Sequence, residues 1–194
     1  MTLTTDIIIE TIRDCLSPDL LSNKWNAIVD QSGEGNKVAG HCAIASEALY
    51  DLLGGASAGY TPYVCAYYQD RQGKRVFGQA PKGAEQMTHW WLRAPTEGKR
   101  GQGDILDATV RQYKKPFPYT RGRATGFMSP TPPSKRARIL IARVEKKLGA
   151  KKITAFREAQ ITKFQEAGGV VKLTKASQRR RAELSAELRR HKIR

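Results

Sequence analysis

The stretch GHCAIASEALYDLLGG, residues 40–55, predicts a buried α-helix that runs from His41 to Leu53. The pair Gly54-Gly55 ends it, since glycine adopts the left-handed conformation that helix ends favour. Cys42 stands at the N-terminal end, where free backbone N–H groups and the helix dipole stabilise a negative charge. A thiol in that position can have a lowered pKa. Cys42 is therefore a candidate nucleophile.

Two hairpins are predicted after this helix. Residues 63–69 are rich in aromatic and β-branched residues, and a polar turn separates them from a short strand near Val76. The second hairpin pairs THWWLR, residues 88–93, with DILDAT, residues 104–109, across a glycine-rich turn. Helices followed by short strands indicate an α+β protein, with N-terminal helices packed on a small antiparallel sheet.

The second hairpin brings a histidine and an aspartate together. If its turn is centred near residue 98 or 99, His89 faces residues 107–109 of the returning strand. Asp107 then becomes a cross-strand neighbour of His89 and can hold the imidazole ring. Cys42, His89 and Asp107 follow the order of nucleophile, base and orienting acid that papain-like hydrolases use.

Each of the three residues also has an ordinary structural interpretation. A cysteine at a buried helix start is often a small core residue, and a histidine beside two tryptophans is often structural. Asp107 can simply begin a turn with Thr109. The combination is more specific than any one member. His41 adjoins Cys42, but its side chain is expected to point elsewhere, which makes it a lesser candidate.

Further helices are expected on both sides of this unit. Thr5 or Asp6 caps a first helix, and Ser17 begins a second. Residues 114–133 form a proline-rich loop, after which Ser134 caps an amphipathic helix.

We divide the chain into an α+β domain at residues 1–133 and a basic helical extension at residues 134–194. The extension is expected to contain a helix capped by Thr154, a short strand at residues 170–173 and a helix at residues 177–191.

The net charge of +16 is distributed unevenly. From Ser134 to the end there are 19 of the 34 Lys and Arg residues but 5 of the 18 Asp and Glu residues. A nearly neutral domain with a basic extension is typical of proteins that bind a polyanion, most often nucleic acid. A solubilising surface helix is the alternative. The candidate nucleic-acid-binding residues are Arg121, Arg123, Lys135, Arg136, Arg138, Arg179, Arg180, Arg181, Arg189 and Arg190.

The helix after Ser134 has an apolar stripe, formed by Ile139, Ile141, Val144 and Leu148. We favour packing of this stripe on the domain over the alternative, a face for a partner protein.

The cysteine content excludes several classes of protein. Three cysteines without a CxxC pair argue against a disulfide scaffold and a structural zinc site, and they favour reduced thiols in the cytoplasm. A metal site of His41, Cys42, Cys65 and His89 has no supporting spacing. We expect no metal and no cofactor, since no Walker loop or deaminase pattern is present. No run of 18 apolar residues exists, so no membrane span is expected.

Several motifs resemble the YunG-like proteins of bacteria and their phages. The matching runs are GHCAIASEALYDLLGG, THWWLR, ILDATVRQY, PFPYTRGRATGFMSP and PSKRARILIARV, which together cover roughly residues 20–145. That family is similar to papain-like cysteine hydrolases in fold, and most members lack a demonstrated activity. The resemblance implies a papain-like domain in which Cys42, His89 and Asp107 form a triad. Gln112 and Tyr113 match the family's run after the aspartate.

The resemblance also implies that Trp25 and residues 26–40 lie over the site. Asn26 stands where the family pattern has serine, which leaves the identity of an oxyanion donor open. The candidates are Asn26, Gln31 and Asn36, together with the backbone N–H of Cys42.

Two hypotheses follow. The first is a cysteine-dependent hydrolase or acyltransferase for an amide, isopeptide or thioester, in which Cys42 attacks, His89 moves the proton and Asp107 orients the ring. The basic tail would direct it to nucleic acid. The alternative is a catalytically idle papain-like scaffold that binds DNA or RNA or inhibits a host protein. Under both hypotheses, the resemblance implies a protein of the cytoplasm of a bacterium or a phage-infected cell. Host or phage proteins would be further partners.

Overall fold

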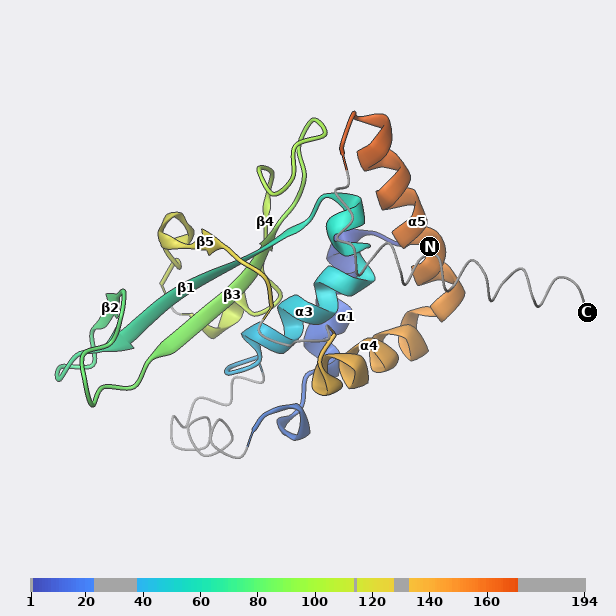
Figure 1. Cartoon of the computed structure of the whole chain (residues 1–194). Coiled ribbons are helices and arrows are strands. Elements are labelled where there is room, and N and C mark those ends of the chain that lie inside the picture. The colour runs from blue at the N-terminus through green and yellow to red at the C-terminus, as the bar shows by residue number, and fades with distance from the viewer. Residues whose placement is uncertain (1, 23–37, 114, 128–132, 171–194) are drawn as a thin grey trace, which may run out of the picture.

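A computed structural model describes residues 2–22, 38–113, 115–127 and 133–170, and it confirms the predicted α+β class (Figure 1). In this part of the chain, four α-helices pack beside one five-stranded antiparallel sheet. None of the described helices combines the length and apolar character needed to span a bilayer. The helices are α1 (Thr5–Cys15), α3 (Cys42–Leu52), α4 (Lys135–Leu148) and α5 (Ala150–Glu166).

The sheet is built on one long antiparallel pair, β1 (Thr61–Gln69) and β3 (Met87–Arg93). The strand order is β2-β1-β3-β4, with β2 (Arg75–Phe77) beside β1 and β4 (Ile105–Leu106) beside β3. The predicted hairpin of β1 and β2 is confirmed. A short strand, β5 (Arg123–Ala124), lies within the segment expected as a loop and pairs with β1.

Four short 3₁₀ helices connect these elements in the described residues. They are η1 (Pro18–Leu20), η2 (Gly55–Ala58), η3 (Val110–Gln112) and η4 (Tyr119–Arg121).

The two faces of the sheet carry different side chains. The register pairs Val64 with Trp90 and Cys65 with His89. Because successive residues of a strand point to opposite faces, Val64 and Trp90 share the face toward α3, where they pack with Cys42. The alternate residues, His89 among them, point to the other face.

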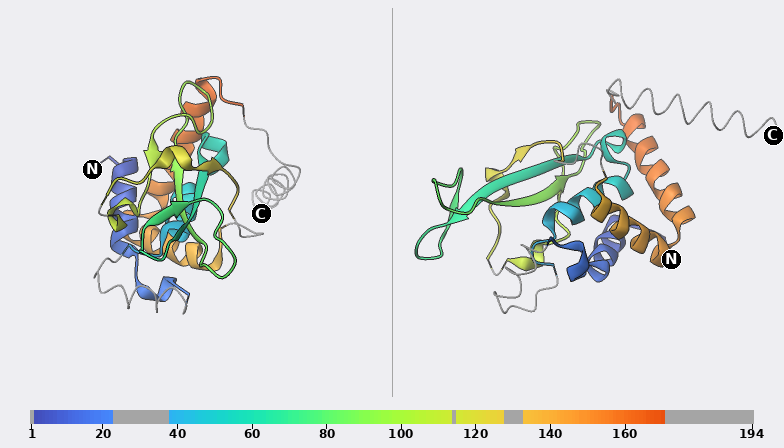
Figure 2. Two further views of the ribbon diagram at one scale, coloured as in Figure 1. Left: turned by 90° about the vertical axis from the view of Figure 1, so that its left-hand side faces the viewer. Right: turned by 60° about the horizontal axis from the view of Figure 1, so that its bottom comes forward.

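α3 is the central helix of the core. It lies between the sheet on one side and α1 and α4 on the other (Figures 1 and 2). Leu49 and Leu52 of α3 are fully buried with Ile12 of α1 and with Leu140 and Val144 of α4. The main core therefore crosses the boundary expected between residues 133 and 134.

α4 is anchored to α3 at its N-cap residue. The hydroxyl of Ser134, the N-cap, accepts the N–H of Ala137 at 3.3 Å. Glu47 of α3 is buried and accepts the Ser134 N–H at 2.9 Å and its hydroxyl at 2.5 Å. Ile141 is buried beneath the helix, whereas Ile139 is exposed. The apolar stripe of α4 thus packs mainly on the domain, which is the interpretation we favoured.

The helix starts differ from expectation at two places. α1 begins after Thr4, whose hydroxyl accepts the N–H of Ile7 at 3.3 Å. α5 begins at Ala150, so the start expected at Thr154 was wrong. Gly149, with a φ of 92°, turns the chain directly from α4 into α5.

The end of the chain is largely outside the described residues. Val170 is not in a strand, and the rest of the strand expected at residues 170–173 and the helix expected at residues 177–191 lie beyond the described part.

Candidate active site

His89 and Asp107 form a buried pair. β3 carries His89, whose side chain is fully buried, and Asp107 follows directly after β4. Nε2 of His89 lies 2.7 Å from Oδ2 of Asp107. The fold thus brings two of the three predicted site residues into direct contact.

Asp107 does not reach His89 through simple cross-strand pairing. β4 ends at Leu106, which faces Leu92, and Asp107 lies beyond the ladder. Oδ1 of Asp107 accepts the N–H of Thr109 at 2.8 Å and the Thr109 hydroxyl at 3.0 Å. An aspartate that bonds the backbone two residues on turns the chain. The strand expected to continue to residue 109 therefore stops early.

The carboxylate of Asp107 is fixed in its charged form. The hydroxyl of Tyr119 donates to Oδ2 at 2.7 Å, beside the bond from His89. Burial alone would raise the pKa of Asp107, but hydrogen bonds from His89, Tyr119 and Thr109 outweigh it, and the pKa is lowered. Burial raises the pKa of Tyr119, and the Asp107 charge raises it further. Tyr119 therefore stays a donor.

Arg13 holds the turn that presents Asp107, and sequence analysis missed it. Its Nε donates to the carbonyl of Ala108 at 2.8 Å, and its Nη2 donates to the carbonyl of Asp107 at 3.1 Å. Glu10 forms an ion pair with the same guanidinium at 2.5 Å. Arg13 is 94 residues from Asp107 in sequence, so no local pattern could have linked them.

The second ring nitrogen of His89 also has a partner. Nε2 of Gln112 lies 3.3 Å from Nδ1 of His89 and 3.0 Å from Oγ1 of Thr109. Because Nε2 of His89 donates to the Asp107 carboxylate, Nδ1 of the neutral ring has a lone pair that accepts the Gln112 N–H. The ring is therefore held in one tautomer.

Aromatic rings enclose His89. Its ring centroid lies 4.4 Å from that of Phe117, 4.8 Å from Tyr113 and 5.7 Å from Trp91. The guanidinium of Arg75 stacks over Tyr113, 4.5 Å from the ring centroid. Part of the proline-rich segment thus covers the sheet face that carries His89.

Cys42 begins α3 at the edge of β3. Its thiol donates to the carbonyl of Thr88 at 3.5 Å, and the backbone N–H of Trp90 lowers the pKa of the sulfur. The pairing of β4 with β3 is limited to Leu92 and Arg93. The sulfur therefore lies against backbone groups on either side of His89, at a stretch of edge that β4 leaves open.

The surroundings keep the Cys42 thiol protonated. Burial raises its pKa to about 12, and the charge of Asp107 acts in the same direction. The backbone N–H groups of Trp90, Ala43 and Cys42 itself lower the pKa but do not overcome burial. In this resting arrangement Cys42 is not an activated thiolate.

Cys42 and His89 are neighbours through the backbone of β3. The hydrogen bond found for the Cys42 sulfur goes to that backbone, and none joins the sulfur to the His89 ring in the described residues. Burial raises the pKa of Tyr113, and the nearby Tyr67 and Cys42 raise it further. Since Tyr113 also packs against His89, Tyr113 lies near both the thiol and the imidazole.

His41 has a separate role. Its ring is buried, with Nδ1 2.9 Å from the carbonyl of Ala39 and Nε2 3.0 Å from the carbonyl of Ser17. The side chain therefore ties the start of α3 to the segment after α1 and takes no part in the His89 network.

The other predicted residues divide into two groups. Trp25, Asn26, Gln31 and Asn36 lie outside the described residues, as do Arg179, Arg180, Arg181, Arg189 and Arg190. Arg121, Arg123, Lys135, Arg136 and Arg138 are described, and all five are exposed.

A cavity of about 420 Å³ opens beside the pair on the side of α1. Asp107 and Tyr119 are among the residues that line it, and Ile9, Ile105 and Val110 contribute apolar side chains to the lining. The described residues contain no group of three or more His, Cys, Asp or Glu side chains placed to hold a metal ion.

Comparison with known proteins adds no relative. No family model matches the chain, and no curated protein or solved structure matches it. The YunG-like resemblance and the papain-like fold therefore stay predictions, and the candidate site rests on its own geometry.

Proposed function

We propose that this protein is a cysteine-dependent hydrolase or acyltransferase that acts on an amide, isopeptide or thioester. The observation that carries the proposal is the buried 2.7 Å pair of His89 and Asp107, together with a cysteine at a helix N-terminus whose thiol bonds to the carbonyl of Thr88, the residue before His89. A histidine with a fixed carboxylate on one nitrogen is the base that a cysteine nucleophile requires.

The proposed reaction begins with transfer of the Cys42 thiol proton to His89. The sulfur bonds to the acyl carbon, and the broken bond's electron pair leaves with the amine or thiol, which takes the proton from His89. Water or another nucleophile then attacks the acyl-Cys42 thioester, and its proton returns to the sulfur through His89. Asp107 stays ionised and orients the ring throughout.

The N-terminus of α3 supports this role for Cys42. The N–H groups of Cys42 and Ala43 are directed at the sulfur, and they lower its pKa against the effect of burial. The N-cap residue His41 makes no side-chain capping bond to these groups. Free N–H groups at a helix start suit both a thiolate and the oxyanion of an acyl-transfer intermediate.

Trapping of an acyl-enzyme tests the proposal. The full chain is incubated with an aryl thioester, quenched in acid and digested, and acyl adducts on each cysteine are quantified by mass spectrometry. We expect acylation of Cys42 to be at least ~100-fold slower in His89→Gln, as for the loss of a general base. Adducts on Cys15 and Cys65 should not change. Equal acylation of Cys42 with and without His89 would overturn the proposal.

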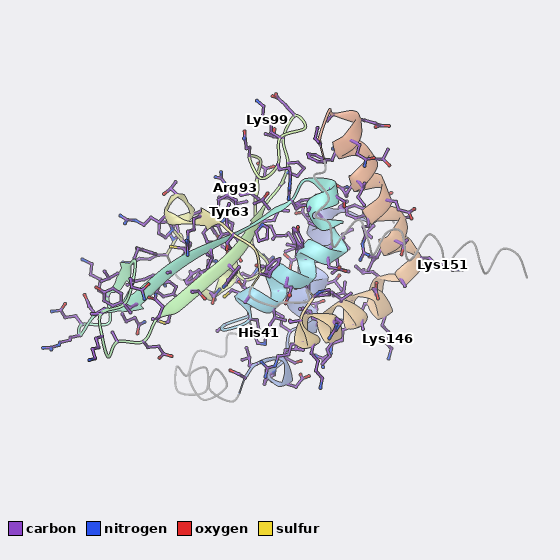
Figure 3. All side chains as sticks on the ribbon, in the orientation of Figure 1. His41, Tyr63, Arg93, Lys99, Lys146 and Lys151 are labelled. Atoms are coloured by element: carbon purple, nitrogen blue, oxygen red, sulfur yellow. The ribbon has the colours of Figure 1, made fainter. Side chains whose placement is uncertain are left out.

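Nucleic-acid binding is a second candidate function, which α4 favours. Lys135, Arg136 and Arg138 are exposed near its N-terminus, and its first turn contains no acid. Cations are unfavourable at the positive end of a helix dipole, so these three do not stabilise α4. Further lysines, Lys146 and Lys151, lie where α4 meets α5 (Figure 3). Such a basic surface suits phosphate groups.

A salt titration of DNA binding tests the second candidate. Each lost phosphate contact lowers the slope of log affinity against log salt by about 0.9. Lys135→Gln, Arg136→Gln and Arg138→Gln together should therefore lower it by about 2 to 3. The control removes the same charge from the exposed Arg71, Lys74 and Lys82. Equal effects of the two triple variants would exclude α4 as the binding surface.

A further inference from the structure

We propose that Gln112 is a positioning residue that keeps His89 in a resting state, because its amide occupies the ring nitrogen that must receive the Cys42 proton. The inference rests on the proposed hydrolase function and deepens it. It makes the site latent: His89 and Asp107 are assembled, and displacement of the Gln112 amide is the step that frees the base.

The hydrogen-bond directions around Gln112 follow from what each group can donate. Asp107 is ionised and can only accept, so the Thr109 hydroxyl gives its hydrogen to Oδ1. The oxygen of Thr109 is then free to accept the amide of Gln112 at 3.0 Å. The second amide hydrogen points to Nδ1 of His89 at 3.3 Å. With these directions, the Thr109 hydroxyl and both hydrogens of the Gln112 amide each have an acceptor.

Nδ1 is the atom on which proton transfer depends. Nε2 of His89 carries a hydrogen that the Asp107 carboxylate holds at 2.7 Å, so the ring can gain a proton only at Nδ1. While the Gln112 N–H bonds to that lone pair, it cannot accept the thiol proton of Cys42. The protonated thiol and the occupied Nδ1 are therefore two features of the same resting state.

Release of Gln112 does not require the pair to come apart. Gln112 is half-buried at the end of η3, and Val110 of the same turn is exposed. Asp107 keeps its bonds to His89, Tyr119 and the Thr109 backbone when the amide turns away. The carbonyl oxygen of an acyl substrate is a competing acceptor for the same N–H. Binding of a carbonyl group can therefore be coupled to release of Nδ1.

Two variants of Gln112 test the inference in the full-length protein. Gln112→Met keeps the length of the side chain and removes the donor, and Gln112→Ala guards against a packing effect of the methionine. At about pH 7.5, we expect both to raise the rate of Cys42 alkylation by iodoacetamide at least ~10-fold, equivalent to 1.4 kcal/mol. Gln102→Met, at an exposed turn position, should leave the rate unchanged.

Cys65 separates release of the base from general loosening. It packs in the same aromatic cluster as Trp91 and Phe117, which enclose His89. An increase shared by Cys42 and Cys65, or a Cys42 rate within ~2-fold of wild type in both variants, would overturn the inference.

¹⁵N NMR of the His89 ring gives an independent readout. Loss of the Gln112 donor should shift the Nδ1 resonance and leave Nε2 bonded to Asp107. An unchanged Nδ1 resonance would also overturn the inference. A different result would overturn the proposed function and leave the inference standing. In that result, Gln112→Met shows the Nδ1 shift, but adding His89→Gln to it leaves the rate of Cys42 alkylation unaltered.

Discussion

Tyr119 and His89 donate to the same oxygen of Asp107, each at 2.7 Å. Tyr119 lies in η4, within the proline-rich segment that covers the sheet. Its hydrogen bond therefore connects this segment directly to the acid of the candidate triad. The cover of the site and the orientation of its base are therefore joined through one carboxylate oxygen. Substitutions in the covering segment should therefore affect the His89–Asp107 pair.

Tyr119→Phe should destabilise the protein by about 1.5 kcal/mol, because it removes a hydrogen bond to a buried charge. Urea unfolding at pH 7 measures the change. Tyr63→Phe is the matched control, since its hydroxyl makes only a long bond, 3.4 Å, to the carbonyl of Gly101. Equal losses in the two variants would show that the tie to Asp107 has no special weight.

Stability should fall in acid because of Asp107. Burial opposes its ionisation, but the hydrogen bonds prevail and lower its pKa. A carboxyl with a lowered pKa stabilises the fold above its ordinary value of about 3.9, and this is lost as pH falls through the folded value. Between about pH 5 and 2, the unfolding free energy of the wild type should therefore drop more steeply than that of Asp107→Asn. Parallel curves would contradict this assignment.

Arg13→Met should cost about 1–3 kcal/mol, because the carbonyls of Asp107 and Ala108 lose a charged donor. Arg111→Met is the control: its side chain is 63% exposed, and its ion pair with Glu10 lies on the surface. That variant should change stability by less than about 0.5 kcal/mol. Thermal unfolding of the two variants measures both losses of stability. A larger loss in Arg111→Met than in Arg13→Met would refute the structural role assigned to Arg13.

Gly122→Ala should disrupt the cover of the sheet. A Cβ at this position would lie 2.0 Å from Cη2 of Trp91, which is fully buried and cannot move aside. We expect a loss of about 3 kcal/mol. Gly126→Ala meets no atom within 4 Å and should change stability by less than about 1 kcal/mol. Similar unfolding midpoints for the two variants would mean that the segment does not pack on Trp91.

Local sequence patterns were sufficient to predict most of the helices and strands. The glycine pair after α3, the aromatic strands and the Ser134 cap act within a few residues of the structure they produce, so α3, the β1–β2 hairpin and the start of α4 could be predicted. The start of α5 could not, because Gly149 turns the chain without a polar cap. β4 was predicted too long, since the side chain of Asp107 competes for the backbone of Thr109.

The candidate site was only partly visible in the sequence. The turn length of the hairpin was enough to place Asp107 near His89. The contribution of Arg13 depends on tertiary packing of α1 against the turn after β4. The role of Gln112 depends on the tautomer of His89, which the Asp107 bond sets. The burial that raises the Cys42 pKa arises from packing with Val64 and Trp90, which no helix-start rule anticipates.

The most direct test of the central claim is the rate of Cys42 alkylation against pH in Gln112→Met and in the double variant Gln112→Met/His89→Gln, because the Gln112 amide holds the base in the wild type. A thiol with a pKa of about 12 reacts through its free thiolate, so without a base its rate should rise tenfold per pH unit from about pH 6 to about pH 10. If His89 removes the proton, the Cys42 rate in Gln112→Met should exceed that in the double variant at about pH 7.5 and rise less than tenfold per pH unit, with Cys15 and Cys65 unchanged. Superimposable Cys42 profiles that rise tenfold per unit in both proteins would contradict the claim that Cys42, His89 and Asp107 form one catalytic site.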